Sequence, residues 1–162
     1  MPDVAVTAAV LGRVIVQAGR ALDAPFGEVL DRYAMTRNAW WLLTELYRSR
    51  KEDVATIGEH ARRSGLAASS ATIAIEQLTA RKLTRRRRPK DNRRITFVTI
   101  TDTGVTFVEQ VRADLETAVA GIYGLYDDND RQLLHDLLVR IVENAEMNVS
   151  SSEMLAATRS PV

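Results

Sequence analysis

The most chemically distinctive part of this chain is a run of basic side chains between residues 81 and 94. The run holds nine Lys and Arg residues against the single Asp91. Cations packed this densely repel one another unless an anionic partner neutralises them. Nucleic acid is such a partner, because Lys and Arg release condensed counterions from the phosphates when they bind. The alternative is that these arginines form only a solvated face.

The net charge of the chain, +1, conceals this segment. Residues 1–47 carry four basic and five acidic side chains, residues 48–94 carry fourteen and five, and residues 95–162 carry four and eleven. The positive charge is therefore concentrated in the middle of the chain and the negative charge in its last third. A near-neutral total is no argument against nucleic-acid binding.

Other chemistry has little support in the sequence. The chain has no cysteine, which excludes disulfides, thiolate metal sites and thiol redox sensing. His60 and His135 are far apart, and we expect no metal site. The sequence offers no nucleophile–base pair and no Gly-rich phosphate loop, so we expect neither an enzyme nor a cofactor. Without an apolar run of roughly 20 residues or an export signal, we expect a cytoplasmic protein with no membrane partner.

Two short helices are predicted just before the basic run. Residues 54–64 and 68–82 both have apolar residues at helical spacing, and Gly65 between them suits a tight turn. We expect Ser69 to be the N-cap of the second helix. A short helix, a turn and a second helix with small residues predict a helix-turn-helix.

The basic run itself predicts a β-hairpin. Thr84–Arg88 and Ile95–Ile100 are expected to be strands, the second because of its β-branched residues. Pro89, Lys90, Asp91 and Asn92 between them are typical of a turn. Most of the positive charge would then lie on a hairpin that directly follows the second helix.

Helices are predicted on either side of this unit. An apolar helical stripe begins near Val6, and Pro25 should end or kink that helix because proline lacks the N–H donor. Thr36 is the expected N-cap of a helix that runs to Tyr47. After the hairpin, Thr101 and Asp102 should begin a long helix whose stripe comprises Val105, Val108, Val111, Leu115 and Val119.

A last helix is predicted over about residues 129–147, followed by a flexible tail. We therefore divide the chain into an N-terminal dimerisation region (1–35), a DNA-binding domain (36–100), C-terminal dimerisation helices (101–149) and the tail (150–162). The first helix and the last two carry long apolar stripes that one chain would not cover, which predicts a two-fold partner.

This order of elements resembles the MarR family of winged-helix transcriptional regulators over about residues 5–147. The segment TIGEHARRSGL is similar to the family's first helix-turn-helix segment, and residues 69–104 are similar to its recognition helix, wing and next helix. Asp91-Asn92-Arg93 matches the family's Asp-x-Arg wing tip. Ile100-Thr101-Asp102-x-Gly104 matches its Leu-Thr-(Glu/Asp)-x-Gly helix entry.

The resemblance implies a mainly α fold with a small β-hairpin wing, in which a winged helix-turn-helix is embedded in a helical dimerisation framework. It implies a homodimer that binds a pseudo-palindromic operator in double-stranded DNA and represses transcription. It also implies relief by a small aromatic or lipophilic effector, and the absence of cysteine excludes the family's thiol-oxidation branch. The alternative function is a winged-helix interaction module that binds RNA or an acidic protein.

Candidate DNA-binding residues lie on the second helix of the helix-turn-helix and on the wing. Exposed positions near the helix N-terminus are suited to reading bases in the major groove: Ser69, Ser70, Thr72, Ile73, Glu76 and Gln77. The wing contributes Arg86, Arg88, Lys90, Asp91, Arg93 and Arg94.

Some of these residues have an alternative role. Ile73, where the family often has Arg, could contact a thymine methyl or turn into the core. Gln77 could pair bidentately with adenine. The resemblance implies that Arg93 enters the minor groove and that Asp91 orients it through a charge-assisted hydrogen bond.

Candidate effector residues centre on Trp40 and Trp41, of which only one can face the core from a helix. The other would cover an interface or form a wall of an effector pocket, because the family binds small molecules between its helical and DNA-binding lobes. Such a pocket would also include Val14, Gln17, Arg37 and Tyr47. His60 is expected to be a half-exposed residue or, alternatively, a ligand or pH contact between the lobes.

Overall fold

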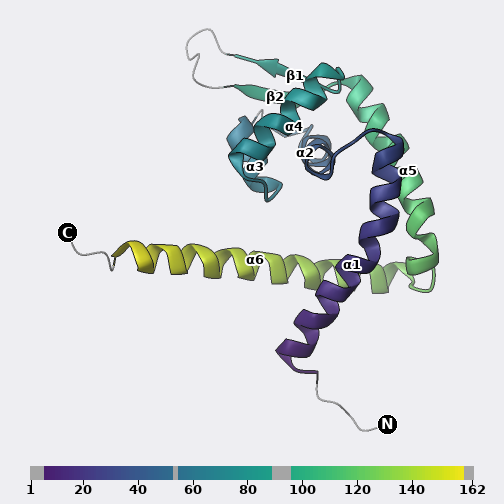
Figure 1. The fold of residues 1–162 in the computed structure, drawn as a ribbon, viewed down its shortest axis with the longest axis vertical. Helices are drawn as coiled ribbons and strands as arrows, with labels where there is room; N and C mark the ends of the chain where they lie inside the picture. Colours follow the sequence, from purple (N-terminus) through teal and green to yellow (C-terminus); the bar gives the residue numbers. More distant parts are fainter. Residues whose placement is uncertain (1–5, 53–54, 89–95, 159–162) are drawn as a thin grey trace. The chain divides into compact units, whose positions relative to one another are not determined.

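The computed structural model describes residues 6–52, 55–88 and 96–158. These residues form six helices and one two-stranded antiparallel sheet (Figure 1). The elements are α1 (Ala8–Arg32), α2 (Arg37–Arg48), α3 (Ile57–Arg63), α4 (Ala68–Ala80), β1 (Thr84–Arg87), β2 (Phe97–Ile100), α5 (Asp102–Tyr123) and α6 (Asp128–Thr158). The predicted fold class, mainly α with a small β-hairpin, is confirmed. The chain divides into two compact units, Met1–Val119 and Ala120–Val162.

Helix α1 is continuous through Pro25, so of the two predicted outcomes, an end or a kink, the end of the helix was wrong. Thr7 caps the helix, accepting a 3.4 Å hydrogen bond from the N–H of Val10. Proline removes a single helical hydrogen bond, and the turns that follow it are held by tertiary packing. Val29 and Leu30, one turn later, are almost completely buried.

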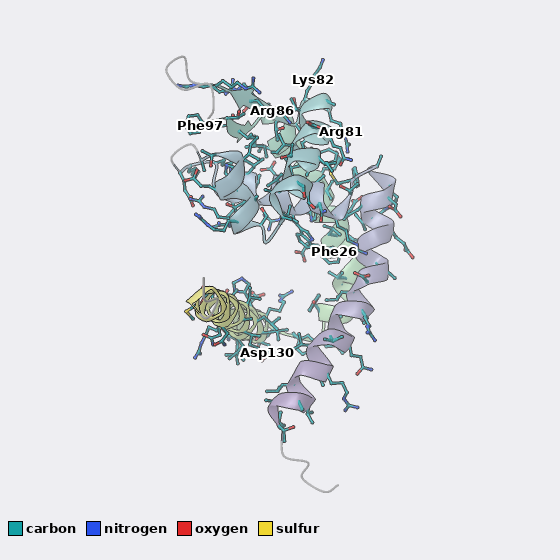
Figure 2. The ribbon with its side chains drawn as sticks, turned by 60° about the vertical axis from the view of Figure 1, so that its left-hand side comes forward. Phe26, Arg81, Lys82, Arg86, Phe97 and Asp130 are labelled. Carbon is teal, nitrogen blue, oxygen red and sulfur yellow. The ribbon has the colours of Figure 1, made fainter. Side chains whose placement is uncertain are left out.

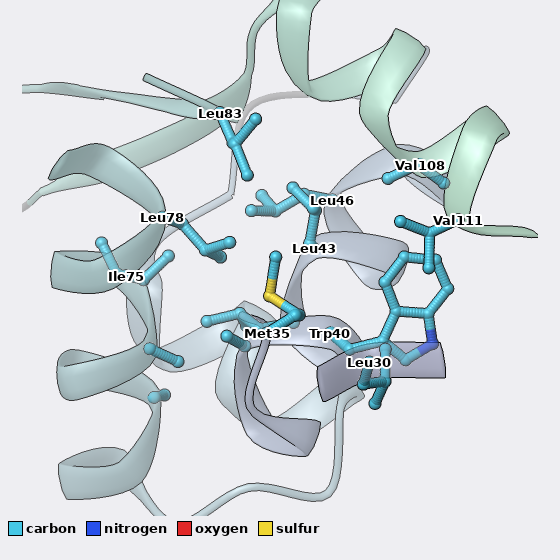
Figure 3. Close-up of a cluster of buried hydrophobic side chains, with 14 of the residues drawn as sticks. Leu30, Met35, Trp40, Leu43, Leu46, Ile75, Leu78, Leu83, Val108 and Val111 are labelled. Atoms are coloured by element: carbon cyan, nitrogen blue, oxygen red, sulfur yellow. The ribbon is translucent and has the colours of Figure 1, made fainter. Parts of the chain in front are cut away.

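The core of the first unit lies around α2. Thr36 caps this helix as predicted, and the apolar face of α2 packs mainly against α4. In Figure 3, Ile75 and Leu78 point from α4 toward Met35 and Leu43, while Trp40 lies beside Val111 of α5. The buried face of α2 thus joins the helix-turn-helix to α1 and α5.

Helices α3 and α4 form the predicted helix-turn-helix. Thr56 and Glu59 make a capping box at the start of α3, with Thr56 Oγ1 accepting from the Glu59 N–H at 3.2 Å. Gly65 lies in the left-handed region at φ +64°, as the turn requires. Helix α4 begins at Ala68, and its N-cap is Ala67, two residues before Ser69, so the assignment of Ser69 as N-cap was wrong.

Strands β1 and β2 form the predicted hairpin arms. The register pairs Thr84 with Ile100 and Arg86 with Val98. A bridge between Thr56 and Phe97 attaches β2 to the start of α3. The predicted turn and the first residue of the second predicted strand, residues 89–95, lie outside the described part of the chain.

The start of α5 is held against the turn that follows α4 by hydrogen bonds and close packing. Thr101 Oγ1 accepts from the Gly104 N–H at 3.0 Å and lies 2.8 Å from the carbonyl oxygen of Lys82. A Cβ atom on Gly104 would lie 2.2 Å from the carbonyl oxygen of Leu83, so only glycine permits this approach. The Thr-Asp-x-Gly motif therefore both begins α5 and packs it against the turn that follows α4.

The second unit contains the end of α5 and the whole of α6. Helix α6 is longer than predicted, and residues 150–158, expected to be part of a tail, are helical. Among the α6 side chains that the structure describes, several large apolar ones are exposed in the single chain, among them Leu133, Leu137 and Ile141. Among the described residues, no helix has the length and apolarity to cross a lipid bilayer.

Candidate nucleic-acid interface

Helix α4 has a buried face and an exposed face. Ala71, Ala74, Ile75 and Leu78 are buried, as expected for the core side of the helix. The exposed residues include the predicted base readers Ser69, Thr72 and Ile73, together with Glu76, and Ser70 is half-buried. Ile73 has 58% of its surface exposed, which decides between its two alternatives: it faces solvent and not the core.

Gln77 differs from these residues because it already has a partner in the protein. Its Oε1 atom accepts a 3.2 Å hydrogen bond from the hydroxyl of Thr36, the N-cap of α2. Bidentate pairing with adenine uses both the oxygen and the nitrogen of a glutamine amide. Gln77 would have to leave Thr36 to read adenine in this way.

The arginines of β1 alternate between the two faces of the hairpin, as strand geometry requires. Arg85 and Arg87 are exposed, whereas Arg86 is half-buried and shares a face with the buried Thr84. The Nε and Nη2 atoms of Arg86 are buried and have no hydrogen-bond partner among the described residues. In Figure 2 the side chain of Lys82, just before the strand, extends away from the ribbon.

The candidate residues of the wing are thus only partly described. Arg88 is exposed and donates from Nε to Thr96 Oγ1 at 3.4 Å. Lys90, Asp91, Arg93 and Arg94 lie outside the described residues. Arg85 and Arg87 were not among the predicted residues, although the period-two alternation from the buried Thr84 could have identified them.

A cluster of charged side chains joins α2 to the helix-turn-helix. Glu45 is only 6% exposed, and its Oε2 atom accepts from Arg48 Nη2 at 2.8 Å and Nε at 3.0 Å. Its Oε1 atom lies 3.7 Å from Arg63 Nη1 and 3.8 Å from His60 Nδ1. Neither Glu45 Oε1 nor His60 Nδ1 has a hydrogen-bond partner among the described residues.

His60 is 3% exposed, so the expectation of a half-exposed histidine was wrong. Its helix packs against both α2 and α4, and this packing buries the imidazole. Burial lowers the pKa of His60, and the nearby Arg63 lowers it further. The carboxylate of Glu45 opposes this shift only in part.

The two tryptophans face opposite ways. Trp40 is buried, whereas Trp41 is 43% exposed and its ring centre lies 6.1 Å from that of Phe26. One tryptophan therefore packs inward, as expected. Trp41 lines a surface hollow of about 310 Å³ together with Thr44, Glu45, Arg48, Arg63 and Ser64.

The other predicted effector residues are not gathered at this hollow. Arg37 pairs with Asp23 at 3.1 Å, and Tyr47 donates to Glu109 of α5 at 3.2 Å. Gln17 lines a separate hollow on α1, and Val14 is exposed on the same helix. In the described part of the chain, no group of three or more His, Cys, Asp or Glu residues is arranged to hold a metal ion.

Solved structures similar to this chain are transcriptional regulators. NadR in complex with 4-hydroxyphenylacetate matches with a TM-score of 0.68 and 21% identity, over 87% of this chain and 97% of NadR. BpsR of Bordetella bronchiseptica, described by the regulation of its DNA binding by 6-hydroxynicotinic acid, matches at 0.67 and 20% over 82% and 98%. MarR of E. coli matches at 0.66 and 17% over 81% and 95%.

Scans against protein-family models and against curated proteins found no match. The structural likeness nevertheless covers most of this chain and nearly all of each similar structure. The chain therefore has the winged-helix fold of the MarR-family transcriptional regulators.

Proposed function

We propose that this protein is a sequence-specific, DNA-binding transcriptional regulator, a dimeric repressor released by a small aromatic molecule, and not an enzyme. The observation that carries the proposal is the outer face of α4, which exposes Ser69, Thr72, Ile73 and Glu76 directly before a strand with exposed arginines. Polar and apolar side chains on one exposed helix face are suited to base edges, and arginines beside them to phosphates.

In this proposal α4 enters the major groove, and β1 and the residues that follow it contact the sugar–phosphate backbone. Arg85 and Arg87 join Arg88 as phosphate contacts because all three are exposed. Arg93 would enter the minor groove, whose negative potential attracts arginine, and Asp91 would orient it. Lys90 and Arg94 would add to the positive charge of the wing.

A homodimer accounts for the exposed apolar residues of the long helices. Leu11, Val14 and Val16 of α1 are exposed, as are several leucines of α6. Covering such surfaces with a second copy lowers their free energy without any further partner. If a two-fold dimer binds two half-sites one DNA turn, about 34–36 Å, apart, the operator is a pseudo-palindrome.

The hollow beside Trp41 is a candidate effector site. It combines an exposed indole with the guanidinium groups of Arg48 and Arg63, which suits a small aromatic acid. NadR was solved with 4-hydroxyphenylacetate, and 6-hydroxynicotinic acid regulates DNA binding by BpsR. An effector here would release DNA only if it bound the free and DNA-bound conformations unequally.

Selection of DNA from a random pool by the purified protein tests the proposal. We expect recovery of a pseudo-palindrome. The logarithm of the binding constant for this DNA should decrease linearly with the logarithm of the salt concentration. Substituting Arg85 and Arg87 by Gln should reduce that slope by about two, whereas Arg20→Gln on α1 should leave it unchanged. Equal affinity for unrelated DNA sequences, or preference for RNA or an acidic protein, would favour the interaction-module alternative.

A further inference from the structure

We propose that Arg81 is a positioning residue that holds the C-terminal end of α4 against the α1–α2 turn and α5, and does not contact phosphate. This inference deepens the proposed function, because it identifies what sets the orientation of the DNA-reading helix. It separates Arg81 from the other basic residues of the run to which it belongs.

Arg81 is exposed, as Arg85 and Arg87 are, but its guanidinium already has partners within the protein. Its Nη1 atom donates a 3.2 Å hydrogen bond to the carbonyl oxygen of Ala34, and its guanidinium carbon lies 4.9 Å from the centre of the Phe107 ring. Phe107 in turn packs edge-to-face against Tyr33, with ring centres 5.5 Å apart. The Tyr33 hydroxyl donates to Asp114 Oδ2 at 2.9 Å.

These contacts form a continuous connection from the end of α4 to the middle of α5. Only arginine can make both the hydrogen bond to Ala34 and the contact with the Phe107 ring. The edge of its planar guanidinium donates hydrogen bonds while its face lies against an aromatic ring. A lysine would supply the charge but not the planar stacking surface. Arg81 is therefore matched to its surroundings by shape as well as by charge.

Ala34, which accepts the hydrogen bond, has an unusual backbone. Its φ of +47° lies in the left-handed region, which is unfavourable for residues other than glycine. The hydrogen bond from Arg81 helps to hold this conformation in the turn between α1 and α2. The end of α4 and the turn therefore constrain each other.

Gln77 attaches α4 to the same region one helical turn earlier. It accepts from Thr36, two residues beyond Ala34, and residues four apart lie on one side of a helix. Gln77 and Arg81 thus anchor the C-terminal half of α4 to the start of α2. In this proposal the N-terminal half of α4, where Ser69, Thr72 and Ile73 are exposed, contacts the bases.

The test compares Arg81→Gln with Lys82→Gln, which removes an equal charge from a side chain that extends away from the ribbon (Figure 2). If α4 is tilted by the loss of the Arg81 contacts, it should lose contacts with the bases while the arginines of β1 keep their contacts with the phosphates. We expect Arg81→Gln to lower the ratio of specific to non-specific DNA affinity about tenfold, the loss expected from one base contact, with an unchanged salt slope. Phe107→Leu should do the same, and Arg81→Lys should not restore the ratio.

A salt slope reduced by about one in Arg81→Gln, with the affinity ratio unchanged, would assign Arg81 to phosphate and overturn the proposal. A variant that is merely less folded would lose specific and non-specific binding equally, which also counts against it. If the wild-type protein binds no DNA, the proposed function fails, and the contacts of Arg81 are tested by measurements of stability alone.

In thermal or urea unfolding, the effects of Arg81→Gln and Phe107→Leu on the free energy of unfolding should be non-additive in the double variant. Additive effects overturn the inference.

Discussion

The Nδ1 atom of His60 lies 3.8 Å from the Oε1 atom of Glu45, and both side chains are almost completely buried. Glu45 comes from α2 and His60 from the first helix of the helix-turn-helix. Arg48 and Arg63 supply the positive charge that a buried carboxylate needs. The position of α3 on α2 is thus coupled to the charge state of His60, whose pKa burial lowers.

The buried histidine should make stability depend on pH. The pKa of His60 is lowered in the folded protein, so as pH falls through about 6.5 the unfolded chain takes up a proton first. Neutral His60 makes its full contribution to stability above the unfolded pKa of about 6.5. That contribution is lost as the pH falls from there through the lower pKa of the folded protein. The urea concentration at the midpoint of unfolding should therefore decrease as the pH is lowered from 7.5 to 5.5.

The matched control uses the second histidine. His60→Gln should remove most of this pH dependence, whereas His135→Gln, at an exposed position on α6, should keep it. An unchanged pH dependence in His60→Gln would show that other groups, and not the Glu45–His60 pair, are responsible.

Gly104→Ala should destabilise the protein. The new Cβ would lie 2.2 Å from the backbone oxygen of Leu83, which cannot move without displacing the turn after α4. A cost of about 1–3 kcal/mol is expected in the free energy of unfolding, as for other overpacked positions. Gly121→Ala in the same helix meets nothing within 4 Å and should be neutral or stabilising by up to about 1 kcal/mol. Equal effects of the two substitutions would contradict the packing role of Gly104.

Ile73→Ala should relax DNA preference at one base pair. Ile73 is exposed on the outer face of α4, where an apolar side chain can contact a thymine methyl. Binding measured to a panel of single-base variants of the selected operator should show a loss of discrimination at one position in each half-site. Uniform weakening on every sequence would mean that Ile73 reads no base.

Trp41 should report on the effector. Its indole is exposed beside Arg48 and Arg63, whereas Trp40 is enclosed in the core. Titration with 4-hydroxyphenylacetate, the ligand of the similar NadR, should quench tryptophan fluorescence in the wild type and in Trp40→Phe. The quenching should be lost in Trp41→Phe. Quenching that persists in Trp41→Phe would place the ligand elsewhere, and no quenching in any of these proteins would argue against this hollow as a site for that acid.

Patterns within a few consecutive residues were sufficient to predict most of the secondary structure. The helix-turn-helix followed from the apolar spacing in residues 54–64 and 68–82 and from Gly65. The hairpin followed from the β-branched residues of its second strand and the turn residues before it. Caps, tight turns and apolar periodicity act over three or four residues, so their effect is encoded locally. The charge distribution along the chain likewise required only counting.

Other features depended on residues far apart in the chain. Three such features are the burial of His60, the hydrogen bond from Thr36 to Gln77 and the hydrogen bond from Arg81 to Ala34, all of which arise where distant segments pack together. The continuity of α1 through Pro25 is of the same kind, because the burial of Val29 and Leu30 offsets a local loss. By itself the sequence determined most of the helices and strands and where the positive charge lies. Only the tertiary structure decided which charged and polar side chains face solvent and which hold the helices together, because that depends on the surfaces that each element buries.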